Sequence, residues 1–282
     1  MTHVGRFAPS PTGPLHFGSI IAAAGSFLAA KAAGGKWLVR IEDVDEARTA
    51  PGAASEILRV LEKLGMAWDG EVVFQSQRTQ LYRDALESLG SFTYPCSCSR
   101  REIEGIYRGT CRNGARGEAR AIRVRVENER IAFFDAIQGE FAQNPEREIG
   151  DFVLLRADGY FAYQLAVVVD DKEQGVTHVV RGADLLDSTP RQIHLQRCLC
   201  FETPAYAHLP VAANSHGEKL SKQTLASPVE ADVPVLFRAI GFLGQNPPEE
   251  LLGADIPSLW SWAIANWDME KIPKTKMIQE NA

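Results

Sequence analysis

The chain has 282 residues, of which 45% are hydrophobic and 23% charged, and its formal net charge is −6 at pH 7. This length can bury a core in one large domain with at most a small appendage, and the composition excludes a disordered or fibrous protein. The acidic balance excludes a protein that coats nucleic acid by bulk electrostatics, so any RNA contact must use local basic patches.

The sequence has no apolar run of about 18 residues, the length that a membrane-spanning helix needs. Its start, MTHVGRFAPSPTG, lacks the basic residues and apolar stretch of a signal peptide. The five cysteines, an odd number in two bunches, fit a reducing compartment better than a disulfide framework. We therefore expect a cytoplasmic protein without membrane contact, and a monomer as the default.

The first 90 residues alternate between strand and helix patterns. Strands are predicted at residues 3–8 and 36–41, and helices at 18–33, 51–64 and 77–89. Pro51 is expected in the first turn of its helix, and the turn-rich PSPTGP in a loop. Such alternation predicts a parallel sheet covered by helices.

The pattern changes at residue 92. A Cys-, Arg- and Gly-rich stretch (92–120) precedes the alternating segments AIRVRV and RIAFFD, which together suggest an insertion between two halves of a sheet. Strands are predicted again at FVLLR, YFAYQLAVVVDD, HVVRG and AHLPVAA, with a helix at 190–200, so the parallel sheet is expected to resume there. The 59 residues after Gln223 hold helix-like segments at 233–242 and 258–265 and are expected to be too short for a large second domain.

The loop PSPTGPLHFGS lies where an open α/β sheet binds ligands, after a strand and before a helix. Gly13 permits a tight turn, Gly18 lets a nucleotide approach the backbone, and His16 could donate to a triphosphate. A lone H-x-G also arises by chance, however, and such a His can simply cap the helix.

A second motif, KLSK, spans residues 219–222. Lys219 and Lys222 can both reach a pyrophosphate and stabilise the charge that builds up on it when a carboxylate attacks the α-phosphorus. Taken alone, such a pair is more often a solvated surface pair.

Together these two motifs, about 200 residues apart, resemble the HIGH and KMSKS motifs of class I aminoacyl-tRNA synthetases. The strings GRFAPSPTGPLHFGS, RIEDVDEAR, AYQLAVVVDD, VVRGADLLDST, AHLP and EKLSK are similar to the glutamyl and glutaminyl branch of that family, over roughly residues 3 to 225. The motifs depart from the family pattern at Phe17, Ser19, Leu220 and Gln223.

The resemblance implies an α/β fold with a Rossmann-like parallel sheet. Its parts would be a first half of the catalytic domain (1–91), a zinc-binding insertion with connecting strands (92–150), a second half with the KMSKS-like loop (151–225) and a short helical C-terminal region without an anticodon-binding domain (226–282).

The resemblance also implies sites for ATP, with Mg²⁺, and for glutamate. A selective glutamate site needs two cationic groups for the carboxylates and one anionic group for the ammonium. Arg6 and Arg181 would hold the carboxylates, in an order that stays open, and Glu42 the ammonium. The remaining glutamate-site residues would be Phe7, Ala8, Pro9, Ser10 and Tyr163. ATP would be bound by His16, Gly18, Ser19, Lys219, Ser221 and Lys222, of which His16, Lys219 and Lys222 would be catalytic.

Cys96, Cys98 and Cys111 offer three thiolates, most of a tetrahedral zinc site, although three buried reduced cysteines without a metal are the alternative. On spacing alone the fourth ligand stays open between Tyr107, Glu102, Glu104, a distant residue and water. A resemblance to the smaller, glutamyl-queuosine branch of the family, which holds zinc with three Cys and one Tyr, implies Tyr107 and one structural Zn²⁺ per chain. The other cysteines, Cys198 and Cys200, are predicted to pack in the core.

Resemblance to that branch implies tRNA-independent activation of L-glutamate by ATP and its transfer to the queuosine base at the wobble position of tRNA(Asp). The eight arginines between residues 100 and 125 are a candidate surface for the anticodon stem-loop. The alternatives are a small glutamate-tRNA ligase that charges the tRNA 3′ end, a small-molecule nucleotidylyltransferase, and a catalytically inactive, zinc-stabilised RNA-binding paralogue.

Overall fold

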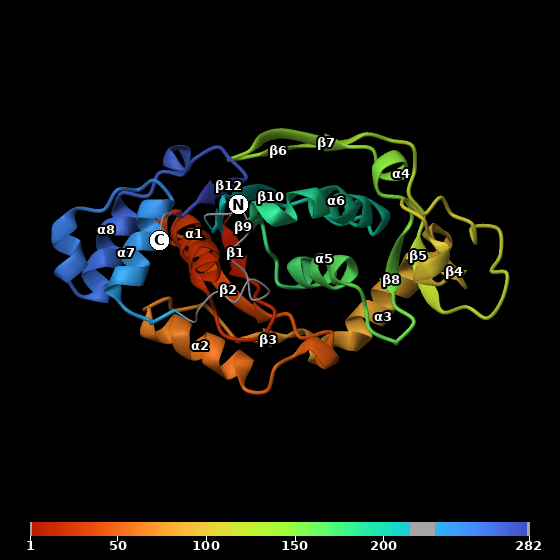
Figure 1. The fold of residues 1–282 in the computed structure, drawn as a ribbon, viewed down its shortest axis with the longest axis horizontal. Coiled ribbons are helices and arrows are strands. Elements are labelled where there is room, and N and C mark those ends of the chain that lie inside the picture. Colours follow the sequence, from red (N-terminus) through yellow and green to blue (C-terminus); the bar gives the residue numbers. More distant parts are fainter. Residues whose placement is uncertain (1, 215–228, 281–282) are drawn as a thin grey trace.

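The structure is a computed structural model that describes residues 2–214 and 229–280. Two parallel sheets lie edge to edge at its centre (Figure 1). The first has the order β1-β2-β3 (Val4–Phe7, Lys36–Ile41, Val73–Phe74), and the second has the order β9-β10-β6 with β7 antiparallel at its edge (His178–Gly182, Ala205–Leu209, Ile131–Asp135, Gly139–Gln143). The sheets adjoin at β1 and β9, where the Val4 N–H donates to Thr177 Oγ1 at 2.9 Å and the Thr177 N–H to the Val4 carbonyl at 3.0 Å.

Helix α1 (Phe17–Ala32) is the centre of the larger core. Its sequence, FGSIIAAAGSFLAAKA, is apolar on nearly all sides, as expected for a helix enclosed between a sheet and other helices. It packs on β1, β2 and β9 and is covered by α7 (Val233–Phe242) and α8 (Ile256–Ala265). Close packing requires Gly25, because a Cβ there would come within 2.5 Å of a Leu209 methyl carbon.

Among the described residues the structure has five further α-helices. Helix α5 packs against both α3 and α6 and joins a second buried cluster. Their bounds are Ala53–Lys63 for α2, Thr79–Ser88 for α3, Pro145–Glu148 for α4, Tyr163–Glu173 for α5 and Thr189–Cys198 for α6.

A separate antiparallel sheet, β4-β5-β8, forms the far end of the molecule (Figure 1). Its strands are Thr93–Cys96, Ala121–Val124 and Phe152–Leu155. The loop between β4 and β5 carries the cysteine cluster and adds the isolated bridge Tyr107–Gly150. A small sheet pairs β11 (Val211–Ala213) with β12 (Met277–Gln279).

Most of the predicted elements are confirmed, including β1, β2, β9, α1, α2, α3, α6, α7 and α8. Pro51 lies two residues before α2, so its predicted place in the first turn is wrong. The prediction of a strand at YFAYQLAVVVDD is also wrong, because residues from Tyr163 onward form α5. An apolar run buried on all sides has no periodicity that separates helix from strand.

Two further predictions about the second half are wrong in detail. FVLLR does form a strand, β8, but it pairs with β5 in the antiparallel sheet rather than in the parallel one. AHLPVAA is divided at Pro210 into β10, in the parallel sheet, and β11, which pairs with β12. Of the two alternating segments, AIRVRV forms β5 in the antiparallel sheet, whereas RIAFFD forms β6 beside β10.

In the part of the chain described, no helix is both long and apolar enough to cross a membrane.

Candidate active site and metal centre

The predicted amino-acid-binding residues lie at the carboxyl ends of neighbouring parallel strands. Arg6 is in β1, Glu42 follows β2 directly and Arg181 is in β9. Parallel strands bring their carboxyl ends to one edge of a sheet, which is where open α/β folds bind ligands. The structure therefore gathers at one edge three residues that the sequence spreads over 176 positions.

Arg6 and Glu42 belong to one buried charge network whose centre is Asp171. Arg6 Nε lies 3.3 Å from Asp171 Oδ1, and Arg40 Nη2 lies 2.8 Å from the same oxygen. Arg40 also lies 3.5 Å from Glu42 Oε1, and its side chain is fully buried. Buried charges need partners of opposite sign, and the network supplies them.

A second carboxylate, Asp170, anchors the outer side of the same network. Its oxygens accept hydrogen bonds from Gln75 at 2.8 Å, Arg78 at 2.7 Å and Tyr82 at 2.8 Å. Arg40 Nε lies 3.8 Å from it. Arg6, Arg40 and Arg78 thus balance the three carboxylates of Glu42, Asp170 and Asp171, so the network carries no excess positive charge if all are ionised.

Arg181 is the additional cation at this edge. Among the described residues it forms no ion pair and donates hydrogen bonds to groups without negative charge: His208 Nε2 at 3.0 Å, Thr189 Oγ1 at 2.9 Å and Tyr163 Oη at 3.3 Å. The guanidinium is buried, at 5% exposure for the residue. A cation held in place without a protein anion is suited to binding a carboxylate.

Glu42 has a strongly altered acidity for a carboxyl group. Burial raises the pKa of its carboxyl to about 7, although Arg40 and Arg6 act in the opposite direction. The charges of Arg181, Glu42 and Arg6 all influence the pKa of Tyr163, which burial raises. The predicted carboxylate, ammonium and pocket-lining groups are therefore near neighbours.

The predicted nucleotide loop is tied to the same edge by backbone hydrogen bonds. The Glu42 N–H donates to the Pro9 carbonyl at 3.0 Å, and the Ala50 N–H donates to the Pro11 carbonyl at 2.9 Å. His16 is the N-cap residue of α1 in an extended conformation, and its side chain does not cap the helix. Its side chain therefore does not have the simple structural role that the sequence left open.

Not every predicted site residue has a side chain directed to this edge. Phe7 is buried in the core and stacks on Trp37 at 6.3 Å between ring centroids, so its backbone is the part that can face a ligand. Gly18 and Ser19 lie in the first turn of α1, and Ala8, Pro9 and Ser10 follow β1. The predicted residues Lys219, Ser221 and Lys222 lie outside the described residues.

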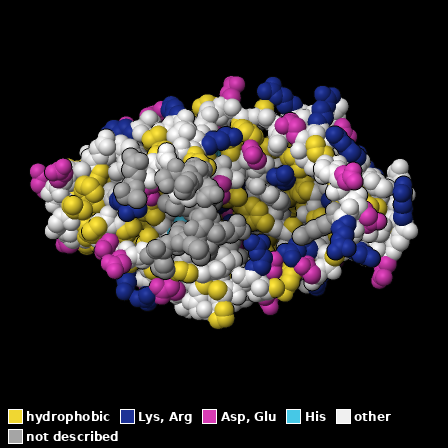
Figure 2. Space-filling model, in the orientation of Figure 1, with side chains coloured by type: hydrophobic (Ala, Val, Ile, Leu, Met, Phe, Trp, Pro, Cys, Tyr) yellow, Lys and Arg dark blue, Asp and Glu magenta, His cyan; other side chains and the backbone are white. Residues whose placement is uncertain are grey.

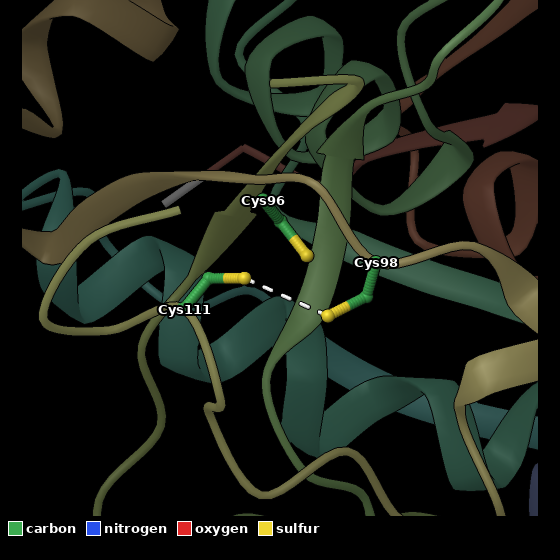
Figure 3. A group of neighbouring side chains, drawn as sticks. All are labelled: Cys96, Cys98 and Cys111. Atoms are coloured by element: carbon green, nitrogen blue, oxygen red, sulfur yellow. Dashed lines mark hydrogen bonds between the residues drawn. The ribbon is translucent and has the colours of Figure 1, made fainter. Parts of the chain in front are cut away.

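The three predicted metal-binding cysteines converge. The sulfur atoms of Cys96, Cys98 and Cys111 all lie within 4.8 Å of one another, and Figure 3 shows them pointing to one point between the strands. Cys98 and Cys111 are 3.6 Å apart. Tetrahedral zinc with Zn–S bonds of about 2.3 Å separates its sulfur ligands by roughly 3.8 Å, so this cluster could hold a metal ion.

Tyr107 is the neighbouring oxygen. Its hydroxyl lies 3.3 Å from the Cys96 sulfur and 3.7 Å from that of Cys98. Glu102 instead accepts the Ser99 N–H at 2.6 Å, and Glu104 is exposed. These contacts favour the phenol over either glutamate as a fourth ligand.

The arginine patch is smaller than the sequence suggests. Arg123 is buried, donates to the Cys96 sulfur at 3.3 Å and lies 4.0 Å above the Tyr107 ring. Arg112 pairs with Asp151 at 2.6 Å, and Arg125 donates to the Arg112 carbonyl at 2.7 Å. Among the side chains of this patch that the structure describes, those of Arg101, Arg108, Arg116 and Arg120 are exposed. Figure 2 shows Lys and Arg side chains gathered at this end of the molecule.

The prediction for the second pair of cysteines is only half right. Cys198 is partly buried and packs against the second hydrophobic cluster. Cys200, however, is exposed and has a φ of 55°, just after α6 ends. The predicted helix was two residues too long, and the extra residues placed Cys200 wrongly in the core.

The sequence reasoning missed several buried polar residues that hold the site together: Arg40, Asp135, Asp170, Asp171 and His208. A charged residue inside an otherwise apolar segment could have revealed them, since such residues are rarely buried without a partner. Such a charged residue occurs in RIEDVDEAR, AYQLAVVVDD and AHLP. The partner of each residue is distant in sequence, so a local sequence pattern cannot identify the pair.

The parallel sheet, the loop before α1 and the predicted amino-acid-binding residues at the strand ends are the features expected of the catalytic domain of a class I aminoacyl-tRNA synthetase. The family described as tRNA synthetases class I (E and Q), catalytic domain, matches residues 3–234, and the chain belongs to this family.

Curated relatives are similar over nearly the whole chain. A glutamyl-Q tRNA(Asp) synthetase of Aromatoleum aromaticum is 56% identical, over 96% of this chain and 91% of the relative. The protein of the same name from Dechloromonas aromatica is 54% identical, over 97% of both chains.

Solved structures agree on the fold. A glutamate tRNA ligase from Elizabethkingia meningosepticum, in complex with its amino acid, superposes with a TM-score of 0.81 at 25% identity, over 98% of this chain and 66% of that one. The glutamate-tRNA synthetase of Elizabethkingia anophelis gives a TM-score of 0.82 at 24% identity, over the whole of this chain and 68% of that one. This chain thus corresponds to about two thirds of each ligase.

Proposed function

We propose that the protein activates L-glutamate with ATP, without needing tRNA, and transfers the glutamate to the queuosine base at the wobble position of tRNA(Asp). The observation that carries the first half is the buried pocket edge formed by Arg6, Glu42 and Arg181. The acceptor is supported by the name shared by relatives above 50% identity.

The charge pattern of the pocket fits glutamate. Glu42 would accept the ammonium group, and Arg6 and Arg181 would each hold one carboxylate. Arg6 shares Asp171 with Arg40, whereas Arg181 has no described anionic partner. A neutral amide side chain would leave one buried cation without its carboxylate, which disfavours glutamine.

Activation follows from placing the amino acid beside the nucleotide loop. An oxygen of the α-carboxylate attacks the α-phosphorus of ATP, the bond to the bridging oxygen breaks, and pyrophosphate leaves with the electron pair. His16, the Gly18 N–H group, the Ser19 hydroxyl, and Lys219, Ser221 and Lys222 would stabilise the phosphate charge. Mg²⁺ bound to ATP neutralises part of that charge.

Transfer then needs a hydroxyl of the acceptor base. The hydroxyl oxygen attacks the carbonyl carbon of glutamyl-AMP, AMP leaves, and the hydroxyl proton is released with it. The exposed residues Arg101, Arg108, Arg116 and Arg120 are our candidates for phosphate contacts with the anticodon stem-loop.

We assign the cysteine cluster to one structural Zn²⁺ held by Cys96, Cys98, Tyr107 and Cys111. The sulfur separations and the adjacent phenol support four-coordination, and the Arg123 guanidinium beside them offsets part of the negative charge of thiolates and phenolate. A bound metal would stiffen a loop that only a small core supports. We also propose a cytoplasmic location, because free thiols are typical of a reducing compartment.

ATP–pyrophosphate exchange tests the activation step. We expect exchange that requires glutamate and proceeds without tRNA, and a Lys222→Ala variant that loses rate far more than glutamate affinity. If no amino acid supports exchange, the result would instead indicate the RNA-binding paralogue.

Labelled glutamate tests the acceptor. We expect label on tRNA from cells that make queuosine and none on tRNA from cells that lack it. A second candidate is charging of the tRNA 3′ end, which is supported by the fold shared with the glutamate tRNA ligase of Elizabethkingia meningosepticum. Label that ignores queuosine and disappears when the terminal adenosine is removed would establish that candidate instead.

A further inference from the structure

Arg181 is connected to a buried carboxylate through a histidine. Its Nε lies 3.0 Å from His208 Nε2, and His208 Nδ1 lies 2.5 Å from Asp135 Oδ2. The three residues come from β9, β10 and β6, which are consecutive strands of the second sheet. The contacts therefore run across three neighbouring strands of the sheet, from β6 to Arg181 at the amino-acid site.

The whole chain of contacts is shielded from water. The side chains of His208 and Asp135 have no exposed surface, and Arg181 is almost as buried. The Tyr206 ring lies 6.1 Å from the His208 ring and 5.6 Å from the Arg181 guanidinium carbon. Water cannot replace a lost hydrogen bond here, so each donor needs its acceptor.

Donor chemistry fixes the tautomer of His208. An arginine Nε–H can only donate, so His208 Nε2 must accept and cannot carry a proton. The ring proton then lies on Nδ1 and is donated to Asp135. Burial and the positive charge of Arg181 lower the pKa of His208, whereas the hydrogen bond to Asp135 raises it. The net effect is a lowered pKa, so the ring is neutral at neutral pH.

We propose that Asp135 and His208 are positioning residues for glutamate binding, because Asp135 selects the His208 tautomer that accepts the Nε–H of Arg181 and so fixes the guanidinium plane. The inference rests on the proposed role of Arg181 as a carboxylate ligand. Thr189 and Tyr163 hold the other two nitrogens, so His208 completes a three-point support. A guanidinium that is already held in its binding orientation loses less conformational entropy when the ligand binds.

Asp135 offers a substitution that changes the tautomer with little effect on the fold. Its Oδ1 accepts the backbone N–H groups of Ile137 at 3.1 Å, Gln138 at 2.9 Å and His208 at 3.0 Å, and an asparagine Oδ1 can do the same. An asparagine amide facing Nδ1 donates rather than accepts. The ring proton then moves to Nε2, where it meets the Nε–H of Arg181.

The kinetic test compares Asp135→Asn and His208→Gln in glutamate-dependent exchange. For Asp135→Asn we expect the KM for glutamate to rise about tenfold or more, while the KM for ATP stays within about twofold. His208→Gln can place an amide oxygen near the former Nε2, so its effect should be smaller. Asp135→Asn in the His208→Gln background should add nothing, since an amide has no tautomer to select.

A spectroscopic test reads the tautomer directly in protein labelled with ¹⁵N-histidine. The wild-type spectrum should show one ring protonated at Nδ1, absent from the His208→Gln spectrum, and Asp135→Asn should move that proton to Nε2. Circular dichroism melting of each variant checks that it is folded.

The outcomes separate this inference from the proposed function. Wild-type protein without glutamate-dependent exchange would refute the proposed function and with it the positioning role. Normal wild-type exchange, combined with an unchanged glutamate KM in folded Asp135→Asn, would overturn the positioning role alone. A wild-type His208 ring protonated at Nε2 would overturn the tautomer assignment.

Discussion

At the scale of single residues, the site depends on charged side chains that are buried but paired. Two cations, Arg40 and Arg6, lower the pKa of Glu42, whereas the nearby carboxylates of Asp170 and Asp171 raise it. Burial outweighs the cations, which is why the pKa of Glu42 rises to about 7. A group with such a pKa changes its charge near physiological pH.

Glutamate binding should therefore depend on pH. The ammonium group needs the ionised form of Glu42, and below pH 7 an increasing fraction of this carboxyl is protonated in the empty pocket. We expect the dissociation constant for glutamate to fall as pH rises from 6 to 8, by up to about tenfold for a single proton. Isothermal titration at several pH values measures it.

Glu42→Gln is the control for that pH dependence. The amide cannot titrate, so glutamate should bind this variant more weakly, with an affinity that no longer changes between pH 6 and 8. An equally steep pH dependence in the variant would assign the titration to another group.

Asp171 should stabilise the folded protein through its ion pairs with Arg6 and Arg40. Asp171→Asn leaves Arg6 and Arg40 buried without their shared carboxylate, and we expect a loss of about 3 kcal/mol in the free energy of unfolding. Urea unfolding followed by circular dichroism measures the change. Asp158→Asn is the matched control, because the Asp158 carboxylate pairs with Arg156 at the surface and should cost less than about 1 kcal/mol.

At the scale of elements, the antiparallel sheet and its cysteine loop are largely separate from the parallel sheets. Tyr94, Cys96, Tyr107 and Cys111 form a buried cluster of their own. The cysteine loop, which packs on so small a core, needs another source of stability, which the three converging thiols could provide through a metal.

Metal removal should therefore loosen this element. We expect one zinc per chain by elemental analysis, and a melting temperature that falls several degrees after treatment with a chelator. Cys98→Ser should lose the metal and show the same lower melting temperature before chelation. Cys200→Ser, an exposed cysteine outside the cluster, should behave like the wild type.

Two results would contradict this assignment. One is purified protein without stoichiometric metal and a Cys98→Ser variant of unchanged stability. The other is equal metal content in the Cys98→Ser and Cys200→Ser variants.

At the scale of the whole molecule, the C-terminal helices are part of the catalytic core. Trp260 of α8 is buried, donates to the Leu64 carbonyl at 2.7 Å and lies 4.6 Å from the Phe27 ring of α1. Helix α7 covers the start of α1, where Arg238 lies 4.0 Å above the Phe17 ring. The helix that begins at the nucleotide loop is thus held in place from the C-terminal region.

Trp260→Ala should destabilise the whole molecule. It removes a large buried ring and the donor to Leu64, and we expect a loss of about 4 kcal/mol in the free energy of unfolding, with one cooperative transition in urea. Trp262→Ala, a partly buried neighbour on the same helix, should cost less than half as much. A separate early transition for the Trp260 variant would show that α7 and α8 unfold independently.

Most of the helices and strands could be predicted from the amino-acid sequence, because the periodicity of apolar residues is a local property. The resemblance to the family's motifs predicts Arg6 and Glu42 as glutamate-binding residues, and the parallel direction of β1 and β2 brings both to one edge of the sheet. Cys96, Cys98 and Cys111 could be predicted because close spacing in sequence already limits their separation. Local order and strand direction suffice for such inferences.

The groups that support the site become apparent only in the folded chain. Asp171 and Arg6 are 165 residues apart, and His208 and Asp135 are 73 apart, so no local pattern can pair them. Helix α5 was mistaken for a strand because burial on all sides removes the periodicity that marks a helix. Arg123 likewise points inward to a sulfur rather than outward to RNA. Each of these outcomes depends on contacts between distant segments, which exist only once the chain is folded.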